Sequence, residues 1–170
     1  MCPIVARFGD DGRLCAVTEI PVPVTRLDLD MPLPHYAHPG DAGADLCSTE
    51  SFVLSPGERR LVPTGIAMAL PAGWVGLIHP RSGLAVKHGV SMVNAPGTID
   101  SGYRGEIKVC LVNTDWHDPV SFSRGDRIAQ LVIQHVAQAA FTPVPDVGTT
   151  ARGQGGFGST GVASGSGGTA

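Results

Sequence analysis

The sequence predicts an all-β fold in a single domain. Glycine and proline, with 23 and 14 residues, recur as breaks between short apolar runs, which is the pattern of strands joined by turns. Most of these runs are rich in valine, isoleucine and leucine, which favour strands. One segment alone has a helix signal, residues 83–88, with Ser82 as a candidate N-terminal cap. The 170 residues, of which 42% are hydrophobic, suffice for one core.

The order of the strands follows from where the apolar runs lie between these breaks. The expected strands are residues 22–27, 51–54, 59–63, 66–69, 74–79, 90–93, 106–113, 120–122 and 128–136. A hairpin with strands 4–8 and 13–17 is expected before them. After residue 145 the composition shifts to glycine, serine and threonine. We therefore expect an N-terminal hairpin segment, a β-barrel domain, a glycine-rich lid and a disordered tail, at residues 1–22, 23–145, 146–161 and 162–170.

Charge and cysteine content exclude several classes of protein. The net charge of −3 provides no basic field for a nucleic-acid backbone, although a few local cations can still bind a small anion. The four cysteines are widely spaced and form no C-x-x-C pair, so neither a zinc site nor a disulfide framework is indicated. No apolar run has the roughly 20 residues of a spanning helix, and no signal peptide is visible. We expect a cytoplasmic protein with reduced thiols.

Two segments carry groups suited to a phosphate and its cation. Asp41 and Asp45 flank a small-residue turn before a strand, and carboxylate oxygens near phosphate suit Mg²⁺. Residues 79–84 lie between a strand and the expected helix, where Arg81, the Ser82 hydroxyl and backbone N–H groups can hold phosphate oxygens. The alternatives are an ordinary Asp/Gly turn and a helix cap beside a surface arginine.

Residues 97–106 contain three glycines that bracket an aspartate and a tyrosine. They lie between apolar arms at residues 90–93 and 107–112, which predicts a hairpin with a functional tip. Asp100 is a candidate general base, and Tyr103 can support a flat ring or a sugar. The alternative is a structural hairpin whose tyrosine packs on its own strands.

The last two segments combine charge with polar or glycine-rich sequence. Residues 124–131 begin with a charged turn and enter an apolar strand in which Gln130 needs partners for its amide. An ion-paired turn is the alternative there. Residues 152–161 are too glycine-rich to order alone, so they are either a flexible tail or a lid in which Arg152 meets a terminal phosphate and Phe157 stacks on a base.

In this order, and over residues 41–161, these five segments resemble the five motifs of the homotrimeric dUTPase family. The resemblance implies a jelly-roll-like β-barrel subunit, three of which share active sites at their junctions. The first, second and fourth motifs come from one subunit, the hairpin from a second and the lid from the third. The implied activity is Mg²⁺-dependent hydrolysis of dUTP to dUMP and pyrophosphate, which limits uracil incorporation into DNA and supplies dUMP for dTMP synthesis.

The resemblance also implies a role for individual residues. Asp100 is the catalytic aspartate that orients a water for attack on the α-phosphorus, and Gln130 helps to position that water. Asp45 holds Mg²⁺ through its water shell. Tyr103 packs under the deoxyribose and leaves no space for a 2′-hydroxyl. The implied substrate contacts are Arg81, Ser82, Gly83, Asn94, Thr98, Ile99, Asp100, Tyr103, Lys108, Arg152, Gly156, Phe157, Gly158 and Ser159.

Two alternatives remain, one an enzyme of the same fold and the other a protein of a different functional class. A dCTP deaminase shares the fold and the trimer, but it needs an acid and polar groups aimed at C4 of cytosine. A catalytically silent binding or regulatory module would use the same loops only for structure and for trimer contacts. The completeness of the hairpin and lid motifs favours the triphosphatase over both.

Overall fold

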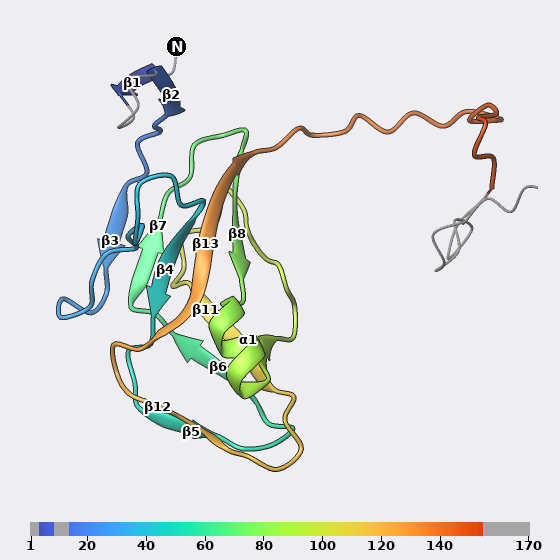
Figure 1. The fold of residues 1–170 in the computed structure, drawn as a ribbon. Coiled ribbons are helices and arrows are strands. Elements are labelled where there is room, and N and C mark those ends of the chain that lie inside the picture. Colours follow the sequence, from blue (N-terminus) through green and yellow to red (C-terminus); the bar gives the residue numbers. More distant parts are fainter. Residues whose placement is uncertain (1–3, 9–13, 155–170) are drawn as a thin grey trace, which may run out of the picture. The chain divides into compact units, whose positions relative to one another are not determined.

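The chain forms strands with one short helix, as expected for an all-β fold (Figure 1). The computed structural model describes residues 4–8 and 14–154. The chain divides into two compact units, Met1–Gln138 and Ala139–Ala170. The elements are β1 (Ile4–Phe8), β2 (Leu14–Thr18), β3 (Val24–Arg26), β4 (Gly43–Cys47), β5 (Phe52–Leu54), β6 (Arg59–Pro63), β7 (Ile66–Met68), β8 (Trp74–His79), α1 (Ser82–His88), β9 (Val90–Met92), β10 (Gly97–Ile99), β11 (Lys108–Asn113), β12 (Val120–Phe122) and β13 (Arg127–His135).

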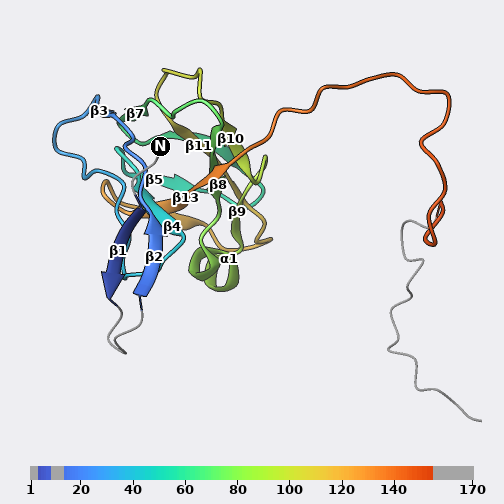
Figure 2. The same ribbon diagram turned by 90° about the horizontal axis from the view of Figure 1, so that it is seen from above.

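Two larger sheets and smaller strand pairs build the first unit. One sheet has the strand order β10-β8-β13-β4 and the other has the order β6-β11-β9. The remaining pairs are β12 with β5, β3 with β7 and β1 with β2. Every pairing is antiparallel. Seen from above, β4, β13 and β8 lie side by side although they are far apart in the sequence (Figure 2).

The core lies between these sheets and consists almost entirely of aliphatic side chains. Alternate residues of β11 are buried, as expected for a strand with one face on the core. The rings of Phe52 and Phe122 stack at 4.8 Å and tie β5 to β12. Among the most deeply buried side chains are Leu54, Val62, Ile66, Ile78, Ile107, Val109, Leu111 and Ile128.

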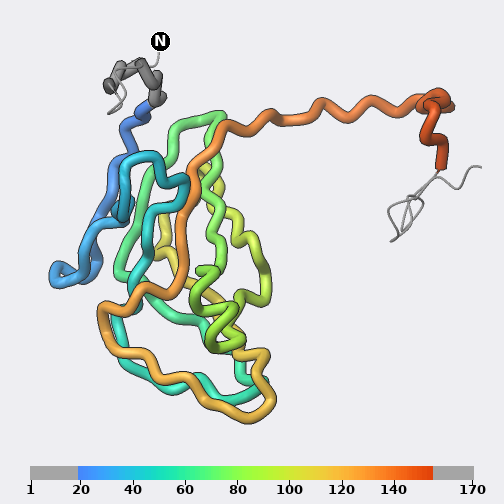
Figure 3. Tube along the Cα trace, viewed as in Figure 1, coloured from blue at the N-terminus to red at the C-terminus, as the bar shows by residue number. Residues whose placement is uncertain are grey.

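Every expected strand has a counterpart in the structure, and four have the predicted limits. These four are β1, β6, β8 and β12. β10 is not predicted by the sequence, because it begins with glycine inside a glycine-rich segment. A strand is expected after the turn at residues 41–45, but β4 already begins at Gly43, so Asp45 lies within the strand. The tube in Figure 3 follows β13, in orange, between β4 and β8. The second N-terminal strand is one residue later than expected, and its turn at residues 9–13 lies outside the described residues.

The predicted hairpin around residue 100 differs from the structure in one respect. Its arms pair as expected, since β9 runs antiparallel to β11 with Met92 opposite Leu111. However, residues 97–99 do not belong to the tip of that hairpin. They form β10 and pair with β8, with Gly97 opposite Ile78. The segment therefore links the two larger sheets, and its tip is the turn that follows residue 99.

Helix α1 begins one residue earlier than predicted. Arg81 occupies the N-cap position without a side-chain cap, so the predicted cap, Ser82, is instead the first helical residue. Gly89 ends the helix with a φ of 62°, a left-handed conformation that glycine adopts without steric cost. Lys87 and His88 lie in the last turn, where a positive charge is favourable. No helix in the described part of the chain is long and apolar enough to cross a membrane.

The second unit is described as far as residue 154. Residues 139–150 form neither helix nor strand, and a turn occupies residues 151–154. In that turn the Gly153 N–H donates to the Thr150 carbonyl at 3.0 Å. Phe141 is 95% exposed in its own unit. Its large apolar ring therefore has no partner within residues 139–154 that removes it from solvent.

Asn113 is a fully buried polar side chain at the end of β11. Its amide nitrogen donates to the carbonyls of Leu54, at 3.1 Å, and Asp118, at 2.9 Å. Its amide oxygen accepts the N–H of Asp115 at 2.9 Å. Asn113 therefore binds three main-chain groups, of which the Leu54 carbonyl is reached by a fully buried hydrogen bond.

Asn113→Ala is expected to lower the free energy of unfolding by about 3 kcal/mol, because these main-chain groups lose their partner in the interior. Urea unfolding at matched protein concentration measures the change. Ser121→Ala, at the exposed position of β12, is the control and should change stability by less than about 0.5 kcal/mol. Equal stability of the two variants would contradict the assigned role.

Candidate active site

A polar pocket of about 500 Å³ lies where β8 runs into α1. Arg81, Ser82 and Gly83 come from that junction. Asp45 of β4 and Gln130 of β13 face the same space, because Gln130 lies opposite Asp45 on one side and His79 on the other. The lining residues are Ala37, Asp41, Ala42, Gly43, Asp45, Arg81, Ser82, Gly83, Leu84, Lys87, His88, Arg127 and Gln130. We call this space the cationic pocket.

Asp45 holds two arginines at the floor of the cationic pocket. Its side chain is only 9% exposed, so its charge needs compensation within the protein. One carboxylate oxygen accepts from Arg81 Nε at 3.0 Å and the other from an Arg127 guanidinium nitrogen at 3.1 Å. Arg81 also reaches the Arg127 carbonyl at 3.4 Å. The two guanidinium groups are thus fixed at one anion-binding surface.

The sequence interpretation does not include Arg127 or Lys87 among the candidate site residues. Arg127 and Gln130 are three residues apart, a spacing that places side chains on opposite faces of a regular strand. The pairing of β13 with β4 shifts register between Arg127 and Ala129, and such a bulge re-aims the side chain beside it. Arg127 therefore faces the cationic pocket with Gln130. The bulge leaves no signal in the sequence.

Gln130 is held tightly between β4 and β8. Its amide nitrogen donates to the Pro80 carbonyl at 3.0 Å, so main chain supplies one of the partners that the sequence predicts for this amide. Gly43 lies against it, and a β-carbon at that position would overlap the Gln130 amide oxygen. Because Gly43 lacks a side chain, the Gln130 amide fits between the strands. The prediction that it positions water remains a prediction.

Burial and nearby charge suppress thiol chemistry beneath this pocket. Burial raises the pKa of Cys47, and the negative charge of Asp45 raises it further. A thiol with a raised pKa is a poor nucleophile at neutral pH. Cys47 is a buried free cysteine and packs as an apolar residue.

A second pocket, of about 440 Å³, lies beside the turn that follows β10. We call it the turn pocket. It brings together five residues that the sequence assigns to nucleoside binding or catalysis, together with two that it does not. The lining residues are Leu61, Thr98, Ile99, Asp100, Tyr103, Glu106 and Lys108. Asn94, by contrast, is exposed near Gly97 and lines neither this pocket nor the cationic pocket.

The turn that carries Asp100 and Tyr103 is closed by its own hydrogen bonds. The Tyr103 N–H donates to the Asp100 carbonyl at 3.0 Å. The Tyr103 hydroxyl donates to the Glu106 carbonyl at 2.9 Å. A β-carbon on Gly105 would lie 2.5 Å from that hydroxyl oxygen, so glycine is required beneath the ring. The ring remains 43% exposed and is available to a ligand.

The two pockets have no lining residue in common in the described part of the chain. Asp100 and Gln130, which the sequence pairs as catalytic residues, line different pockets. Arg152 lies in the second unit, whose placement relative to the first is not defined. The expected lid contacts at Gly156, Phe157, Gly158 and Ser159, and the expected tail at 162–170, lie outside the described residues.

The cationic pocket suits a hydrated cation better than a cation held by protein alone. Among the described residues, no three His, Cys, Asp or Glu side chains are grouped so that they could hold a metal ion. Asp45 is one carboxylate, and Mg²⁺ commonly takes one or two carboxylates with phosphate and water as its other ligands. Each carboxylate oxygen accepts about two hydrogen bonds, so Asp45 can accept one from a metal-bound water while it keeps both arginines. The residues present therefore fit Mg²⁺ bound together with a polyphosphate.

Comparison with known proteins identifies relatives over most of the chain. The dUTPase family model matches residues 30–161. Deoxyuridine 5′-triphosphate nucleotidohydrolase from Thermobifida fusca is 66% identical over 140 residues, covering 82% of this chain and 78% of the relative. The protein of the same name from Nocardia farcinica is 62% identical over 141 residues, covering 83% and 86%.

Solved structures agree with these relatives. The dUTPase of Staphylococcus bacteriophage 80alpha with dUpNHpp has a TM-score of 0.77 and 29% identity, covering 84% of this chain and 99% of that one. A variant dUTPase from phage phi11 of S. aureus, whose structure describes coordination of a structural Mg(II) ion, has a TM-score of 0.70 and 26% identity. That match covers 75% of this chain and 98% of the phage protein.

Proposed function

Because this chain belongs to the dUTPase family, we propose that it hydrolyses dUTP to dUMP and pyrophosphate. The observation that supports this most directly is the pair of pockets. One presents fixed cations, as a triphosphate requires, and the other presents a carboxylate and an aromatic ring, as attack beside a sugar requires. The same family match argues against a dCTP deaminase and against a catalytically silent module.

A complete site requires more than one copy of the chain. Asp100 and Gln130 line different pockets of one chain, and catalysis needs both groups close to the same phosphorus. Head-to-tail association would place the turn pocket of one copy over the cationic pocket of the next, and such contacts form a closed ring of three copies when the rotation between copies is one third of a full turn. We therefore assign a homotrimer with three shared sites, in which the lid segment with Arg152 and Phe157 comes from the third copy.

In this site the Asp100 carboxylate accepts a proton from a water as that water attacks the α-phosphorus. The bond from the α-phosphorus to the bridging oxygen breaks, and pyrophosphate leaves. Gln130 is suited to hold the water, since its amide is fixed by Pro80 and by the proximity of Gly43. Positioned general-base assistance of this kind is typically worth about 10²–10⁴-fold.

Charge stabilisation comes from the cationic pocket. Arg81 and Arg127 are already oriented by Asp45, so they need little reorganisation when phosphate charge develops. Ser82 and Gly83 add a hydroxyl and a main-chain N–H at the start of α1. Bound Mg²⁺ would neutralise phosphate charge, with Asp45 as its partner through water. Arg152 would complete the cations at the γ-phosphate.

The base and the sugar are read in the turn pocket. β10 is an edge strand of its sheet, so one side of residues 97–99 has main-chain groups without a strand partner among residues 4–8 and 14–154. The main chain of Thr98 and Ile99 can therefore pair with the donors and acceptors of uracil, and cytosine mismatches them. Tyr103 supplies the surface under the deoxyribose. Asn94 and Lys108 would complete the contacts at the edge of this pocket.

The purified protein is expected to release pyrophosphate rapidly from dUTP with Mg²⁺, and far more slowly from dCTP, dTTP and UTP. Hydrogen-bond mismatch supplies about 10⁴-fold discrimination against cytosine. Thymine is excluded by the steric bulk of its methyl group, and UTP by contact of its 2′-hydroxyl with Tyr103. A coupled pyrophosphate assay with an ammonia assay on dCTP measures both chemistries. Ammonia release from dCTP would instead identify a deaminase, and inertness toward all four substrates would refute the proposal.

Asp100→Asn should lower kcat by about 10²–10⁴-fold with little change in nucleotide affinity, since it removes the base and keeps the shape. Single-turnover kinetics with dUTP and calorimetric binding of dUMP measure the two effects. Asp118→Asn, a matched change of an exposed aspartate outside both pockets, should retain full activity. A normal kcat in Asp100→Asn would exclude its role as the base.

Mixing Asp100→Asn chains with Arg81→Ala chains should restore activity that neither variant has alone. If the subunits assort at random in equal amounts, about a quarter of the shared sites combine an intact cationic pocket with an intact turn. The activity should therefore recover to about a quarter of the wild-type value after the chains are unfolded together and refolded. Separately refolded samples, mixed afterwards without exchange, are the control. No recovery would show that each site is built from one chain.

A further inference from the structure

Glu106 makes three contacts at the edge of the turn pocket. One carboxylate oxygen accepts the Gly65 N–H at 3.0 Å, and the other lies 3.5 Å from Lys108 Nζ. Its carbonyl accepts the Tyr103 hydroxyl at 2.9 Å. The side chain is 23% exposed and lines the pocket with Asp100 and Tyr103. Glu106 thus connects the turn that carries Asp100 and Tyr103, which we call the catalytic turn, to Lys108 and to the turn between β6 and β7.

The turn between β6 and β7 is a rigid anchor for Glu106. Gly65 has a φ of 68°, and a β-carbon there would lie 2.8 Å from Cβ of Asp28. The Gly65 carbonyl accepts the N–H of Leu27 at 2.7 Å. Next to it, Thr64 donates its hydroxyl to the Ile107 carbonyl at 2.6 Å. The base of the catalytic turn is therefore tied to a segment that cannot move easily.

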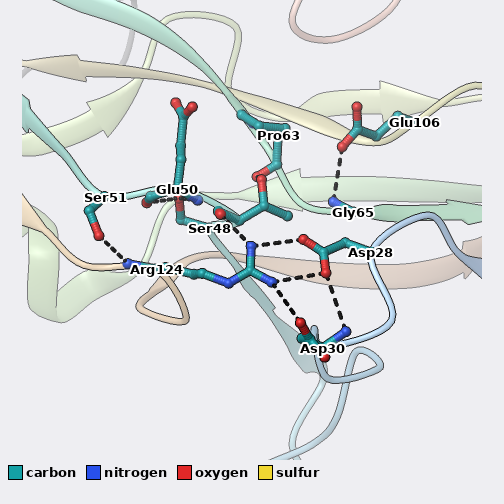
Figure 4. A network of polar contacts seen from close by, with 10 residues as sticks. Asp28, Asp30, Ser48, Glu50, Ser51, Pro63, Gly65, Glu106 and Arg124 are labelled. Atoms are coloured by element: carbon teal, nitrogen blue, oxygen red, sulfur yellow. Dashed lines mark hydrogen bonds and ion pairs between the residues drawn. The ribbon is translucent and has the colours of Figure 1, made fainter.

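Figure 4 shows that this anchor extends beyond Gly65. Asp28 receives two hydrogen bonds from the Arg124 guanidinium, at 2.8 and 2.9 Å. These bonds hold the pKa of the Asp28 carboxyl below its usual value. Arg124 also donates to the Thr49 carbonyl at 2.6 Å. Asp28 is thus fixed where it confines Gly65.

Within the proposed dUTPase function, we infer that Glu106 is a positioning residue that holds the Tyr103 ring and thereby sets the preference for deoxyribose over ribose. The ring can exclude a 2′-hydroxyl only if it is held in a fixed position against Gly105, so that it stays close to the sugar. Its hydroxyl bond ends on the Glu106 carbonyl, and the Glu106 side chain ties that carbonyl to Gly65. Loss of the carboxylate frees the turn and lets the ring move away from the sugar.

The test compares kcat/KM for dUTP and UTP in wild type, Glu106→Ala and Glu106→Gln. Glu106→Ala is expected to lower the dUTP-to-UTP ratio by about tenfold or more, mainly through a higher kcat/KM for UTP, because a ring that has moved away from the sugar no longer excludes the 2′-hydroxyl. Glu106→Gln keeps an oxygen that accepts the Gly65 N–H, so it should retain the ratio within about twofold. Binding of dUMP and UMP, measured by calorimetry, provides the same ratio without turnover.

Glu50→Ala is the matched control. Glu50 also pairs with a cation, Arg60 at 3.0 Å, but it lines neither pocket. It should leave the ratio unchanged. A wild-type ratio in Glu106→Ala would overturn the inference, and so would an equal loss in Glu106→Gln, which would assign the effect to the charge beside Lys108.

Two further outcomes keep the inference separate from folding and from the proposed function. If Glu106→Ala does not fold, Tyr103→Phe removes only the hydroxyl bond to the Glu106 carbonyl and should also lower the ratio. An unchanged ratio in that variant overturns the inference. Wild-type protein that does not hydrolyse dUTP refutes the proposed function instead, and the dUMP-to-UMP binding ratio then decides the role of Glu106.

Discussion

The antiparallel pairing of β13 with two strands at once is the constraint on which the candidate site depends. β13 lies between β4 and β8, which come from the early and middle parts of the chain. The register places Gln130 opposite both Asp45 and His79. His79 is the last residue of β8, just before the loop that enters α1. A slip by one residue would turn Gln130 to the other face of the sheet. The burial of Ile128, Ala129 and Leu131 prevents this slip because it fixes which face meets the core.

Asp45 shows how one buried charge can organise a site before a ligand arrives. A nearly buried carboxylate is costly without compensation, and here two arginines from different elements supply it. The same arginines present their remaining N–H groups to the cationic pocket. The requirement to neutralise Asp45 thus pre-orients the cations that a polyphosphate needs. This arrangement differs from a metal site, because the protein contributes one carboxylate and leaves the other ligands to substrate and water.

The sequence predicts the class of fold better than it predicts which residues the fold brings together. Strands rich in Val, Ile and Leu, such as β6 and β8, follow directly from composition and spacing. β4 and β10 have few such residues and exist because neighbouring strands pair with them. Arg127 is missed because a bulge changes which way it faces. Glu106 is missed because its partner is the main-chain N–H of Gly65. Nearly every residue has such a group, so the sequence does not indicate which one Glu106 binds. Tertiary pairing, which local sequence does not encode, decides all of these cases.

Because β10 is an edge strand, its main chain is open to a ligand, and this limits which substitutions could make the protein resistant to an inhibitor that binds the turn pocket. If a ligand is read by the main chain of residues 97–99, substitution of Thr98 or Ile99 leaves the N–H and C=O groups in place. Substitution at these positions therefore does not remove a contact to the inhibitor and does not cause resistance. Escape would have to act through the backbone itself, and Gly97 is packed against Ile78 and Met92. A compound that copies the hydrogen-bonding edge of the base therefore targets the part of the pocket least open to genetic escape.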